Sequence, residues 1–359
     1  MTVQTRTPSE GIAMRRSPTA RLLLLGGALL ATVAIQAAEP QRGTFSGAAE
    51  TVYPAWFKAS FLDFEEDIAT AAAAGRRYLL FVHQAGCPYC NRMVEVNLAQ
   101  KDIEETMRKH LDVIELNMWG DREVVTVDGQ SFTEKNFARA LNVQFTPTLI
   151  FFDEQGKVAL RLNGYIPPAE FRVALDYVTQ HKEMELSYRD YVAQRAPVTA
   201  AKRLNSAPFL AAPPYDLAAV HTAGKPLAVF FEQTDCPNCD TLHHDVLGAA
   251  LTRDELAAFH AIQLDMWSDP PAVTPDGQAT TARDWARELS IAYAPTIVLW
   301  AADGREVIRS EAWFKTFHTA SILAYVSDGS YRDQPSFQRY ISERAEKFQE
   351  QGVDVDLWR

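Results

Sequence analysis

One internal duplication constrains this 359-residue chain more than any other feature. The segment "GRRYLLFVHQAGCPYC" (75–90) matches "GKPLAVFFEQTDCPNC" (224–239) at an offset of 149 residues, and "FTPTLIFF" (145–152) matches "YAPTIVLW" (293–300) at 148. Matches of this length predict two copies of one domain. Each copy is long enough to bury a core without disulfide staples, so the four cysteines are free for chemistry.

Both copies show the same order of elements. In copy one, the pattern predicts a helix over 61–74, strands over 78–82 and 112–118, and an amphipathic helix that opens at the cysteine pair between them. A hairpin around 154–156 and a helix over 168–180 close the copy. The order β-α-β-α-β-β-α predicts an α/β fold with a mixed central sheet and helices on both faces.

A further helix precedes the hairpin in each copy, and its start carries a sequence signal. In copy one, Ser131 followed by Glu134 has the spacing of a capping box, which predicts a helix from Ser131. Thr281 and Asp284 supply a similar signal in copy two. We therefore expect both helices to begin with a side-chain cap.

The duplication places domain 1 at 50–185 and domain 2 at 215–330. Residues 186–214 form a linker with a short helix, because a helix-like stretch is followed there by several prolines. The tail at 331–359 is charged and helix-prone, and Gly352 is expected to end its helix. We expect this helix to pack against domain 2.

Residues 1–38 have the order of a secretory signal peptide. Three arginines precede the apolar run at 22–35, and small residues at 37 and 38 offer a cleavage site. The run is shorter than the roughly 18 residues of a membrane-spanning helix, so an uncleaved anchor is the lesser alternative. Translation starts at Met1 or Met14. The net charge of −11 predicts no nucleic-acid partner, because an acidic protein repels the phosphate backbone.

The cysteine pairs Cys87–Cys90 and Cys236–Cys239 each follow a buried strand and open a helix. At such a helix start, unpaired N–H groups favour a thiolate, and a thiol pKa near 8.5 falls toward about 7. Proline at the next position, Pro88 or Pro237, fits the first helical residue because its missing N–H costs nothing there. The first cysteine of each pair is the expected nucleophile, and the second resolves the mixed disulfide.

A Cys-x-x-Cys pair has two other uses, a metal site and a structural staple. A zinc site with all four cysteines requires both copies to meet at the metal, and His243 and His244 point about 100° apart on a helix, so we expect no metal and surface histidines. A disulfide across so short a loop removes little chain entropy, which disfavours a structural staple. Redox chemistry is the remaining interpretation.

Both copies resemble thioredoxin domains, over roughly 50–180 and 210–330. The combination of "CPYC", "MWG" (118–120) and "TPT" (146–148) is most similar to the exported SoxW-type thioredoxins of bacteria. The resemblance implies that Thr146-Pro147 and Ala294-Pro295 are cis-proline sites whose backbone at Thr146 and Ala294 pairs with an extended substrate segment. Tyr89 and Asn238, between the cysteines, are expected to tune access to the sulfurs.

Other residues near the cysteines also occur at equivalent positions of the two copies. Trp119 and Trp267, with Met118 and Met266, end a strand in each copy; core packing is the plainer interpretation, and an apolar lip that touches substrate is the alternative. The buried acid that thioredoxin carries six residues before its first cysteine is replaced by phenylalanine in both copies, at 81 and 230. Glu232 is a possible substitute in copy two, and His83 holds that position in copy one.

The groove after the hairpin also differs, with Gly164 in copy one and Ala312 in copy two. These departures predict two sites that are not equivalent, with Cys87 the better-preserved centre.

The resemblance implies a thiol:disulfide oxidoreductase without a cofactor. We expect a periplasmic reductase whose partners are client proteins with disulfides or thiols and a membrane electron donor of the thiol–disulfide interchange type. A disulfide oxidase or isomerase is the alternative within enzymes. A client-binding module with only one active Cys-x-x-Cys domain is the alternative outside them.

Overall fold

The computed structural model describes residues 41–195 and 203–358. The predicted signal peptide and both candidate start positions lie outside the described residues. Both copies belong to one compact unit. None of the described helices is long and apolar enough to cross a membrane.

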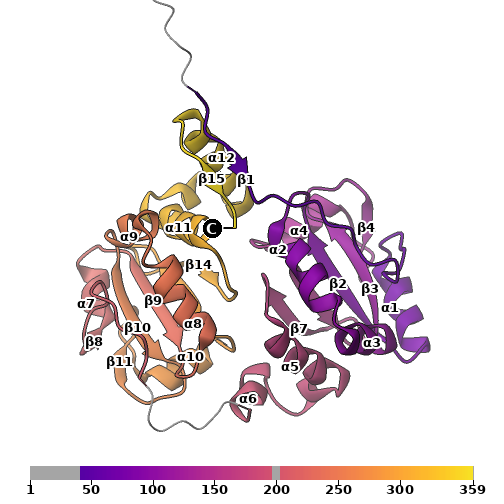
Figure 1. Ribbon diagram of the computed structural model, residues 1–359. Coiled ribbons are helices and arrows are strands. Elements are labelled where there is room, and N and C mark those ends of the chain that lie inside the picture. The colour runs from indigo at the N-terminus through magenta and orange to yellow at the C-terminus, as the bar shows by residue number, and fades with distance from the viewer. Residues whose placement is uncertain (1–40, 196–202, 359) are drawn as a thin grey trace, which may run out of the picture. The chain divides into compact units, whose positions relative to one another are not determined.

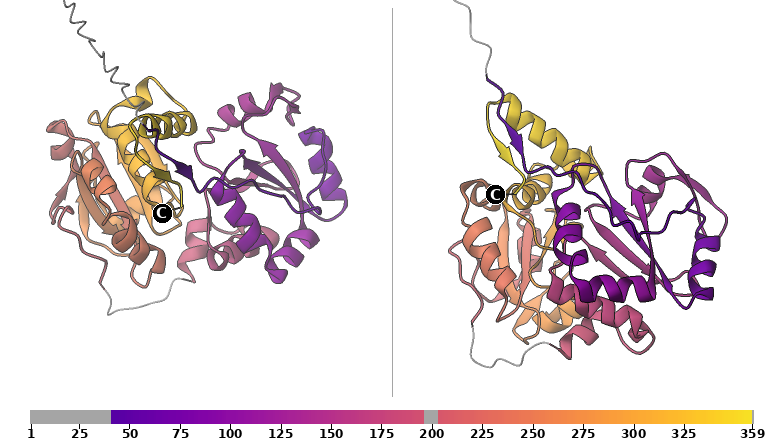
Figure 2. Two further views of the ribbon diagram at one scale, coloured as in Figure 1. Left: turned by 45° about the horizontal axis from the view of Figure 1, so that its top comes forward. Right: turned by 45° about the vertical axis from the view of Figure 1, so that its right-hand side comes forward.

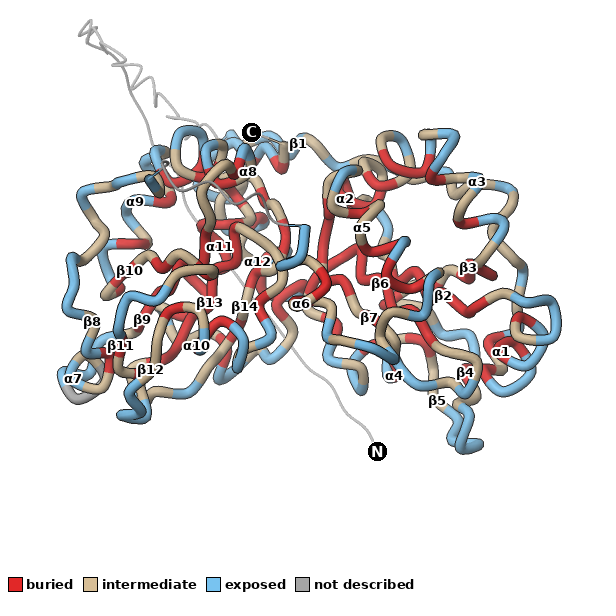
Figure 3. Tube along the Cα trace, turned by 90° about the horizontal axis from the view of Figure 1, so that it is seen from below, coloured by how far each residue is buried: buried red, intermediate tan, exposed pale blue. Residues whose placement is uncertain are grey.

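A four-stranded mixed sheet with the order β3-β2-β6-β7 forms the centre of copy one (Figure 1). Its strands are β2 Arg77–His83, β3 Leu111–Asn117, β6 Thr148–Phe152 and β7 Val158–Asn163. The central strand β2 pairs parallel with β3 and antiparallel with β6. All its residues but the last are buried, as an uninterrupted apolar run predicts (Figure 3).

Copy two repeats this sheet with the order β10-β9-β13-β14. Its strands are β9 Leu227–Glu232, β10 His260–Asp265, β13 Thr296–Trp300 and β14 Glu306–Ser310. The pairing directions are also the same, with β9 parallel to β10 and antiparallel to β13. The predicted fold, a mixed sheet between helices, is present twice.

Helices cover both faces of each sheet (Figure 1). In copy one, alternate residues of β2 separate two cores: Leu79 and Phe81 face α2, α3 and α5, while Leu80 packs with residues of α1 and α4. Copy two has the same division, with α10 and α7 on one face and α8, α9 and α11 on the other. The helix bounds in copy one are α1 Phe64–Ala73, α2 Pro88–Arg92, α3 Lys101–His110, α4 Glu134–Ala140 and α5 Pro168–Thr179. Those in copy two are α7 Leu217–Thr222, α8 Pro237–Thr241, α9 Ala250–Leu256, α10 Ala282–Glu288 and α11 Thr316–Ser327.

The helix that opens at each cysteine pair is interrupted, whereas the sequence predicts a continuous one. In copy one, α2 passes into a π-helical segment, Met93–Leu98, before the chain turns extended at Gln100 and α3 begins. Asn97, at the end of this segment, is fully buried and donates a hydrogen bond to the carbonyl oxygen of Ile166 at 2.9 Å. This bond ties the segment to the loop before α5. Copy two has a matching π-helical segment, Leu242–Val246.

The predicted start of the fourth helix is wrong in copy one and right in copy two. Ser131 belongs to β5 (Ser131–Thr133), which forms a hairpin with β4 (Glu123–Val125), and α4 begins at Glu134 without a side-chain cap. The Glu134 carboxylate is buried and accepts N–H bonds from Asn117 and Arg122, both at 3.1 Å, so it serves the loop after β3. In copy two, the corresponding hairpin pairs β11 (Pro271–Val273) with β12 (Ala279–Thr281).

Thr281 caps α10 as predicted, because its hydroxyl oxygen accepts from the N–H of Asp284 at 3.1 Å.

A helix follows each copy and contacts the opposite copy. The helix α6 (Tyr188–Ala193) lies in the predicted linker, and its Arg189 donates to the carbonyl oxygen of Met266 in copy two at 2.7 Å. The helix α12 (Phe337–Glu350) packs against α11 as predicted, and its Gln338 also donates to the carbonyl oxygen of Gln144 in copy one at 2.9 Å.

The chain turns after α12 at Gly352, where φ is +76°, as the sequence predicts. The last strand, β15 (Val355–Asp356), then pairs in parallel with β1 (Phe45–Ser46) near the start of the described chain (Figure 2). A two-residue strand, β8 (Tyr215–Asp216), pairs with β11 in copy two. Two 3₁₀ turns, Lys182–Met184 and Ser330–Arg332, complete the elements.

Candidate active site

The first cysteine pair joins the end of β2 to α2 through a Cys87–Cys90 disulfide, with Cα atoms 5.3 Å apart. Cys87 has extended backbone geometry at the N-cap of α2, and its Sγ accepts the N–H of Cys90 at 3.0 Å. Pro88 occupies the first helical turn. The helix start therefore directs an N–H group at the sulfur that the sequence predicts as the nucleophile.

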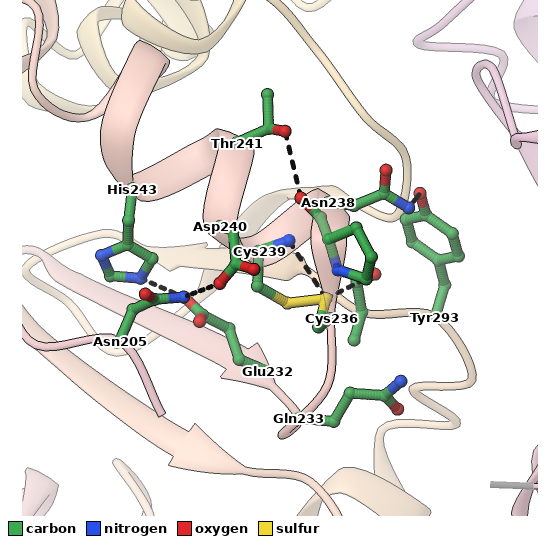
Figure 4. Close-up of a disulfide and its surroundings, with 12 residues drawn as sticks. Asn205, Glu232, Gln233, Cys236, Asn238, Cys239, Asp240, Thr241, His243 and Tyr293 are labelled. Carbon is green, nitrogen blue, oxygen red and sulfur yellow. Dashed lines mark hydrogen bonds and ion pairs between the residues drawn. A yellow bond between two sulfur atoms is a disulfide. The ribbon is translucent and has the colours of Figure 1, made fainter. Parts of the chain in front are cut away.

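The second pair has the same construction. Cys236 and Cys239 form a disulfide with Cα atoms 5.1 Å apart, and Sγ of Cys236 accepts the N–H of Cys239 at 3.0 Å (Figure 4). Cys236 is the N-cap of α8, and Pro237 begins that helix. Both attacking positions are therefore helix N-caps.

A cis-proline loop faces each disulfide. The Thr146-Pro147 and Ala294-Pro295 bonds are both cis, the geometry that the resemblance implies. The carbonyl oxygen of Thr146 lies 3.5 Å from Sγ of Cys87, and that of Ala294 lies 3.6 Å from Sγ of Cys236. The pairing of these loops with an extended substrate stays a prediction.

The chain matches the model of the thioredoxin-like domain twice, at residues 64–179 and 213–323, which together exceed half of its length. The chain belongs to the thioredoxin-like domain family. With two Cys-x-x-Cys disulfides at the expected helix starts, membership of this family supports thiol–disulfide oxidoreductase activity.

Solved structures that resemble the chain each align with about a third of it. A thioredoxin-fold protein from Helicobacter pylori is 20% identical, over 39% of this chain and 87% of that chain, with a TM-score of 0.33. A thioredoxin from Thermus thermophilus is 27% identical, over 33% and 88%, with a TM-score of 0.26. The C-terminal domain of DsbD from Neisseria meningitidis, in the oxidised form, is 14% identical over 32% and 88%, with a TM-score of 0.24. No curated protein matches the chain.

The two thioredoxin-like sites differ in the residue before the cis-proline. In copy one, the hydroxyl of Thr146 donates to Sγ of Cys87 at 3.3 Å. Ala294, in the same place in copy two, has no hydroxyl, so Cys236 lacks this bond. Because a hydrogen bond to sulfur favours the thiolate, the Thr146 bond is expected to make Cys87 the more readily ionised of the two nucleophiles.

The residues near the missing acid also differ between the copies. In copy two, the fully buried carboxylate of Glu232 pairs with Nε2 of His243 at 2.8 Å and accepts from the amide of Gln263 at 3.0 Å. The prediction that His243 is a surface histidine is therefore wrong: only 6% of its side chain is exposed, because the π-helical segment turns it toward β9. His244 is exposed, as predicted.

In copy one, a histidine lies at the place of the acid, and the acid lies on the neighbouring strand. His83 lies where copy two has Glu232, and its ring pairs with Glu115, which stands in place of Gln263. The bond from His83 lowers the pKa of Glu115. The acid is thus on β9 beside the cysteine helix and fully buried in copy two, and on the neighbouring strand β3 and partly exposed in copy one. Phe81 and Phe230 are fully buried in both.

The two tryptophans are neither fully buried in the core nor free of contacts at the surface. Met118 and Met266 are buried, while Trp119 and Trp267 are half-buried and donate to the side chains of Gln84 and Gln233, both at 2.8 Å. The guanidinium of Arg339 lies 5.1 Å from the centre of the Trp119 ring, and that of Arg189 lies 4.4 Å from the Trp267 ring. Each tryptophan thus meets the helix that follows the opposite copy. A direct contact of either ring with substrate stays a prediction.

The residues between the cysteines also contact the opposite copy. Tyr89 is 2% exposed; its hydroxyl oxygen accepts the N–H of Lys315 at 3.0 Å and lies 3.3 Å from Nδ1 of His318. Asn238 donates to Glu170 at 3.4 Å and to the hydroxyl of Tyr293 at 3.2 Å. This double contact was not foreseen, because nothing within one copy's sequence indicates what covers its cysteine loop.

His318 on α11 and Glu170 on α5 are equivalent residues in the duplication. Burial lowers the pKa of His318 to about 3 and raises the pKa of Glu170. Each cysteine loop therefore faces a residue whose charged form is disfavoured by burial. Among the described residues, no cluster of histidine, cysteine and acidic side chains suited to a metal ion was found.

Proposed function

We propose that this chain is an exported thiol:disulfide oxidoreductase that reduces disulfides in client proteins. The observation that carries the proposal is the position of Cys87 and Cys236 at helix N-caps, each within 3.6 Å of the carbonyl oxygen of the residue before a cis-proline. A nucleophilic thiolate and a backbone group for an extended substrate are the two parts that disulfide exchange needs.

The exchange starts from the reduced pair. The thiolate of Cys87 attacks one sulfur of the client disulfide, and the other client sulfur leaves with the electron pair. The thiolate of Cys90 then attacks Sγ of Cys87, which releases the second client thiolate and forms the Cys87–Cys90 disulfide. The same steps apply to Cys236 and Cys239. The N–H bond to Sγ of each first cysteine supports this order, because it favours the attacking thiolate.

The location and partners of the protein belong to the proposal. The signal-like segment at 1–38 supports work in the periplasm, where cytosolic reductants do not reach. A membrane electron donor of the thiol–disulfide interchange type then has to re-reduce both pairs. The similarity to SoxW-type thioredoxins favours the reductive direction.

Insulin reduction tests the activity. We expect the protein lacking residues 1–38 to reduce insulin with dithiothreitol as the electron source. Cys87→Ser/Cys90→Ser and Cys236→Ser/Cys239→Ser should each retain part of the activity, and the quadruple variant none. If one double variant matches the quadruple variant, only one centre is active and the other copy is a client-binding module. No activity in the parent protein contradicts the proposal.

The reduction potential of each pair tests the direction. A value near the roughly −270 mV of thioredoxin supports a reductase, and one near about −120 mV supports an oxidase. Equilibration of each double variant with glutathione buffers, read by mass spectrometry of alkylated thiols, gives the two potentials separately.

A further inference from the structure

Two cavities between the copies occupy equivalent places but differ in size. The larger, of about 760 Å³, lies between β7 and the loop of copy two that ends in the cis-proline, with Ala292 and Tyr293 in its lining. The smaller, of about 230 Å³, lies between β14 and the same loop of copy one, with Gln144 and Phe145 in its lining. Ala292 and Tyr293 align with Gln144 and Phe145 in the duplication.

Aromatic packing explains the small size of the second cavity. The ring of Phe145 contacts Phe314 and Phe337, with centroids 5.1 Å and 5.4 Å apart, so rings from α12 and the loop before α11 fill the space beside copy one. In copy two, Tyr293 directs its hydroxyl to Asn238 instead. The larger of the two spaces is therefore the one beside copy two.

The large cavity adjoins residues that surround the Cys236 site. Tyr293 and Glu170 line it and also bond the side chain of Asn238, which lies between the two cysteines. Gln233, three residues before Cys236, is a further lining residue. Figure 4 draws Gln233 and Tyr293 beside the Cys236–Cys239 disulfide. A molecule held in the cavity is therefore separated from the cysteine pair by the side chains that bond Asn238, Tyr293 and Glu170.

The lining suits an extended peptide. All six residues of β7, Val158–Asn163, line the cavity, and β7 is an edge strand that pairs, among the described strands, with β6 alone. An edge strand has a row of backbone groups outside its sheet, which an extended segment binds as an added strand. Val158, Val173 and Val192, none of which is buried, add apolar surface for alternate side chains.

We propose that this cavity binds an extended, apolar client segment that contains a cysteine, and that it directs the disulfide of this segment to Cys236. The proposal rests on the disulfide exchange proposed above and adds that copy one supplies half of the client site of copy two. The Cys236 thiolate attacks the client sulfur and forms a mixed disulfide, while the leaving thiol departs as a thiolate. Cys239 then releases the client thiolate by attack on Cys236, so two electrons pass from the pair to the client.

The experiment uses the protein without residues 1–38 and with Cys90→Ser and Cys239→Ser, so that both mixed disulfides are trapped. The probe is the peptide Val-Leu-Cys-Leu-Val, whose cysteine is disulfide-bonded to thionitrobenzoate. Release of thionitrobenzoate gives the rate, and mass spectrometry of digests shows which cysteine holds the peptide. Dithiobis(nitrobenzoate), which has no peptide, is the comparison reagent.

Val173→Trp on α5 of copy one and Val192→Trp on α6 of the linker each fill the cavity, away from the reacting groups. Asp176→Trp, on the exposed side of α5, is the matched control. We expect the peptide to react at Cys236 about tenfold faster than at Cys87, and each filling variant to remove that advantage. The control should behave as the parent, and dithiobis(nitrobenzoate) should react equally with all variants.

Equal peptide rates at the two cysteines, or no effect of both filling variants, overturn the client site while leaving disulfide exchange intact. A loss of rate that is as large with dithiobis(nitrobenzoate) as with the peptide also overturns it, because the cavity is then a passage for small reagents. Failure of both reagents to react with any variant overturns the proposed function itself. Far-UV circular dichroism confirms that the filling variants fold.

Discussion

The two cysteine sites of this chain have one scaffold and different surroundings. Both place the first cysteine at a helix N-cap with an N–H bond of 3.0 Å to its sulfur, opposite a cis-proline loop. Copy one adds the Thr146 hydroxyl to the sulfur and covers Tyr89 almost completely. Copy two has the buried Glu232–His243 pair and the larger cavity.

Both copies keep the N-cap cysteine and the cis-proline loop, which define a redox centre. The side chains that adjust the ionisation and the access of the sulfur differ between the copies. The sulfur position depends on backbone geometry, which both copies retain. Ionisation and access depend on single side chains around the sulfur, and several of these differ between the copies, such as Thr146 and Ala294 or Tyr89 and Asn238. The predictions that follow use pairs of equivalent residues to test this division.

The largest effect is expected at the buried acid of copy two. Glu232→Ala leaves His243 and Gln263 without their shared partner in the core, so we expect a loss of about 3–5 kcal/mol in the free energy of unfolding. Glu115→Ala, at a partly exposed pair in copy one, should cost about 1 kcal/mol or less. Urea unfolding of the oxidised proteins measures both. Equal losses would contradict the proposed inequality of the two pairs.

The second effect is a pH dependence at the residues that face the cysteine loops. The folded-state pKa of His318, about 3, lies below its ordinary value of 6.5, so the stability that neutral His318 provides is present above pH 6.5 and is lost as the pH falls toward 3. Each pH unit in this window costs at most about 1.4 kcal/mol. His318→Gln should flatten the decrease in melting temperature between pH 6.5 and 4.

Glu170, at the equivalent place in copy one, should act in the opposite direction. Its raised pKa means that the stability from its protonated form is present below the ordinary pKa of 4.5 and is lost as the pH rises through the folded value. Glu170→Gln should therefore gain stability over the parent at pH 7 and lose this advantage in acid. A parallel shift at all pH values would contradict this assignment.

A smaller effect compares the two helix starts after the small hairpins. Thr281→Ala removes the cap of α10 and should lower the free energy of unfolding by about 1 kcal/mol. Thr133→Ala, at the uncapped start of α4, is the matched control and should cost clearly less. Urea unfolding midpoints decide the comparison, and equal costs would show that Thr281 does not act as a cap.

The smallest effect concerns the hydroxyl beside the cis-proline. Thr146→Ala should slow the alkylation of reduced Cys87 by iodoacetamide at pH 6 about threefold, because the thiolate loses one hydrogen bond. Ala294→Thr should speed the alkylation of Cys236 by a similar factor. Mass spectrometry of the alkylated peptides measures each cysteine in the same sample. Unchanged rates in both variants would exclude a role for this hydroxyl.

Much of the fold and the centre of each site followed from the sequence, because they depend on local patterns. Buried strands such as β2, the helix starts at Cys87 and Cys236 and the hairpin before Gly164 each have a signal within a few residues. The prediction of a helix cap at Ser131 was wrong because the Glu134 carboxylate bonds the loop after β3, which is distant in the sequence. The prediction that His243 is exposed was wrong because a π-helical segment changes which side of the helix faces the core.

The contacts between the copies had no sequence signal of their own. The contact of Tyr89 with His318 and that of Asn238 with Glu170 depend on how the two copies pack in one unit. The duplication contained a clue, because His318 and Glu170 occupy the same place in their helices. The absence of a hydroxyl at Ala294 was readable from the sequence, but its meaning required the 3.3 Å contact in copy one.

The most direct test of the account uses the protein without residues 1–38 and with all four cysteines. Both disulfides are brought to equilibrium with glutathione in the same sample. Quenched samples are alkylated, and mass spectrometry gives the reduced fraction of each pair. The account predicts two reversible transitions, with the Cys87–Cys90 pair reduced more readily because the Thr146 hydroxyl stabilises its thiolate. A single shared transition, or no reversible reduction at either pair, would contradict the claim of two unequal redox centres.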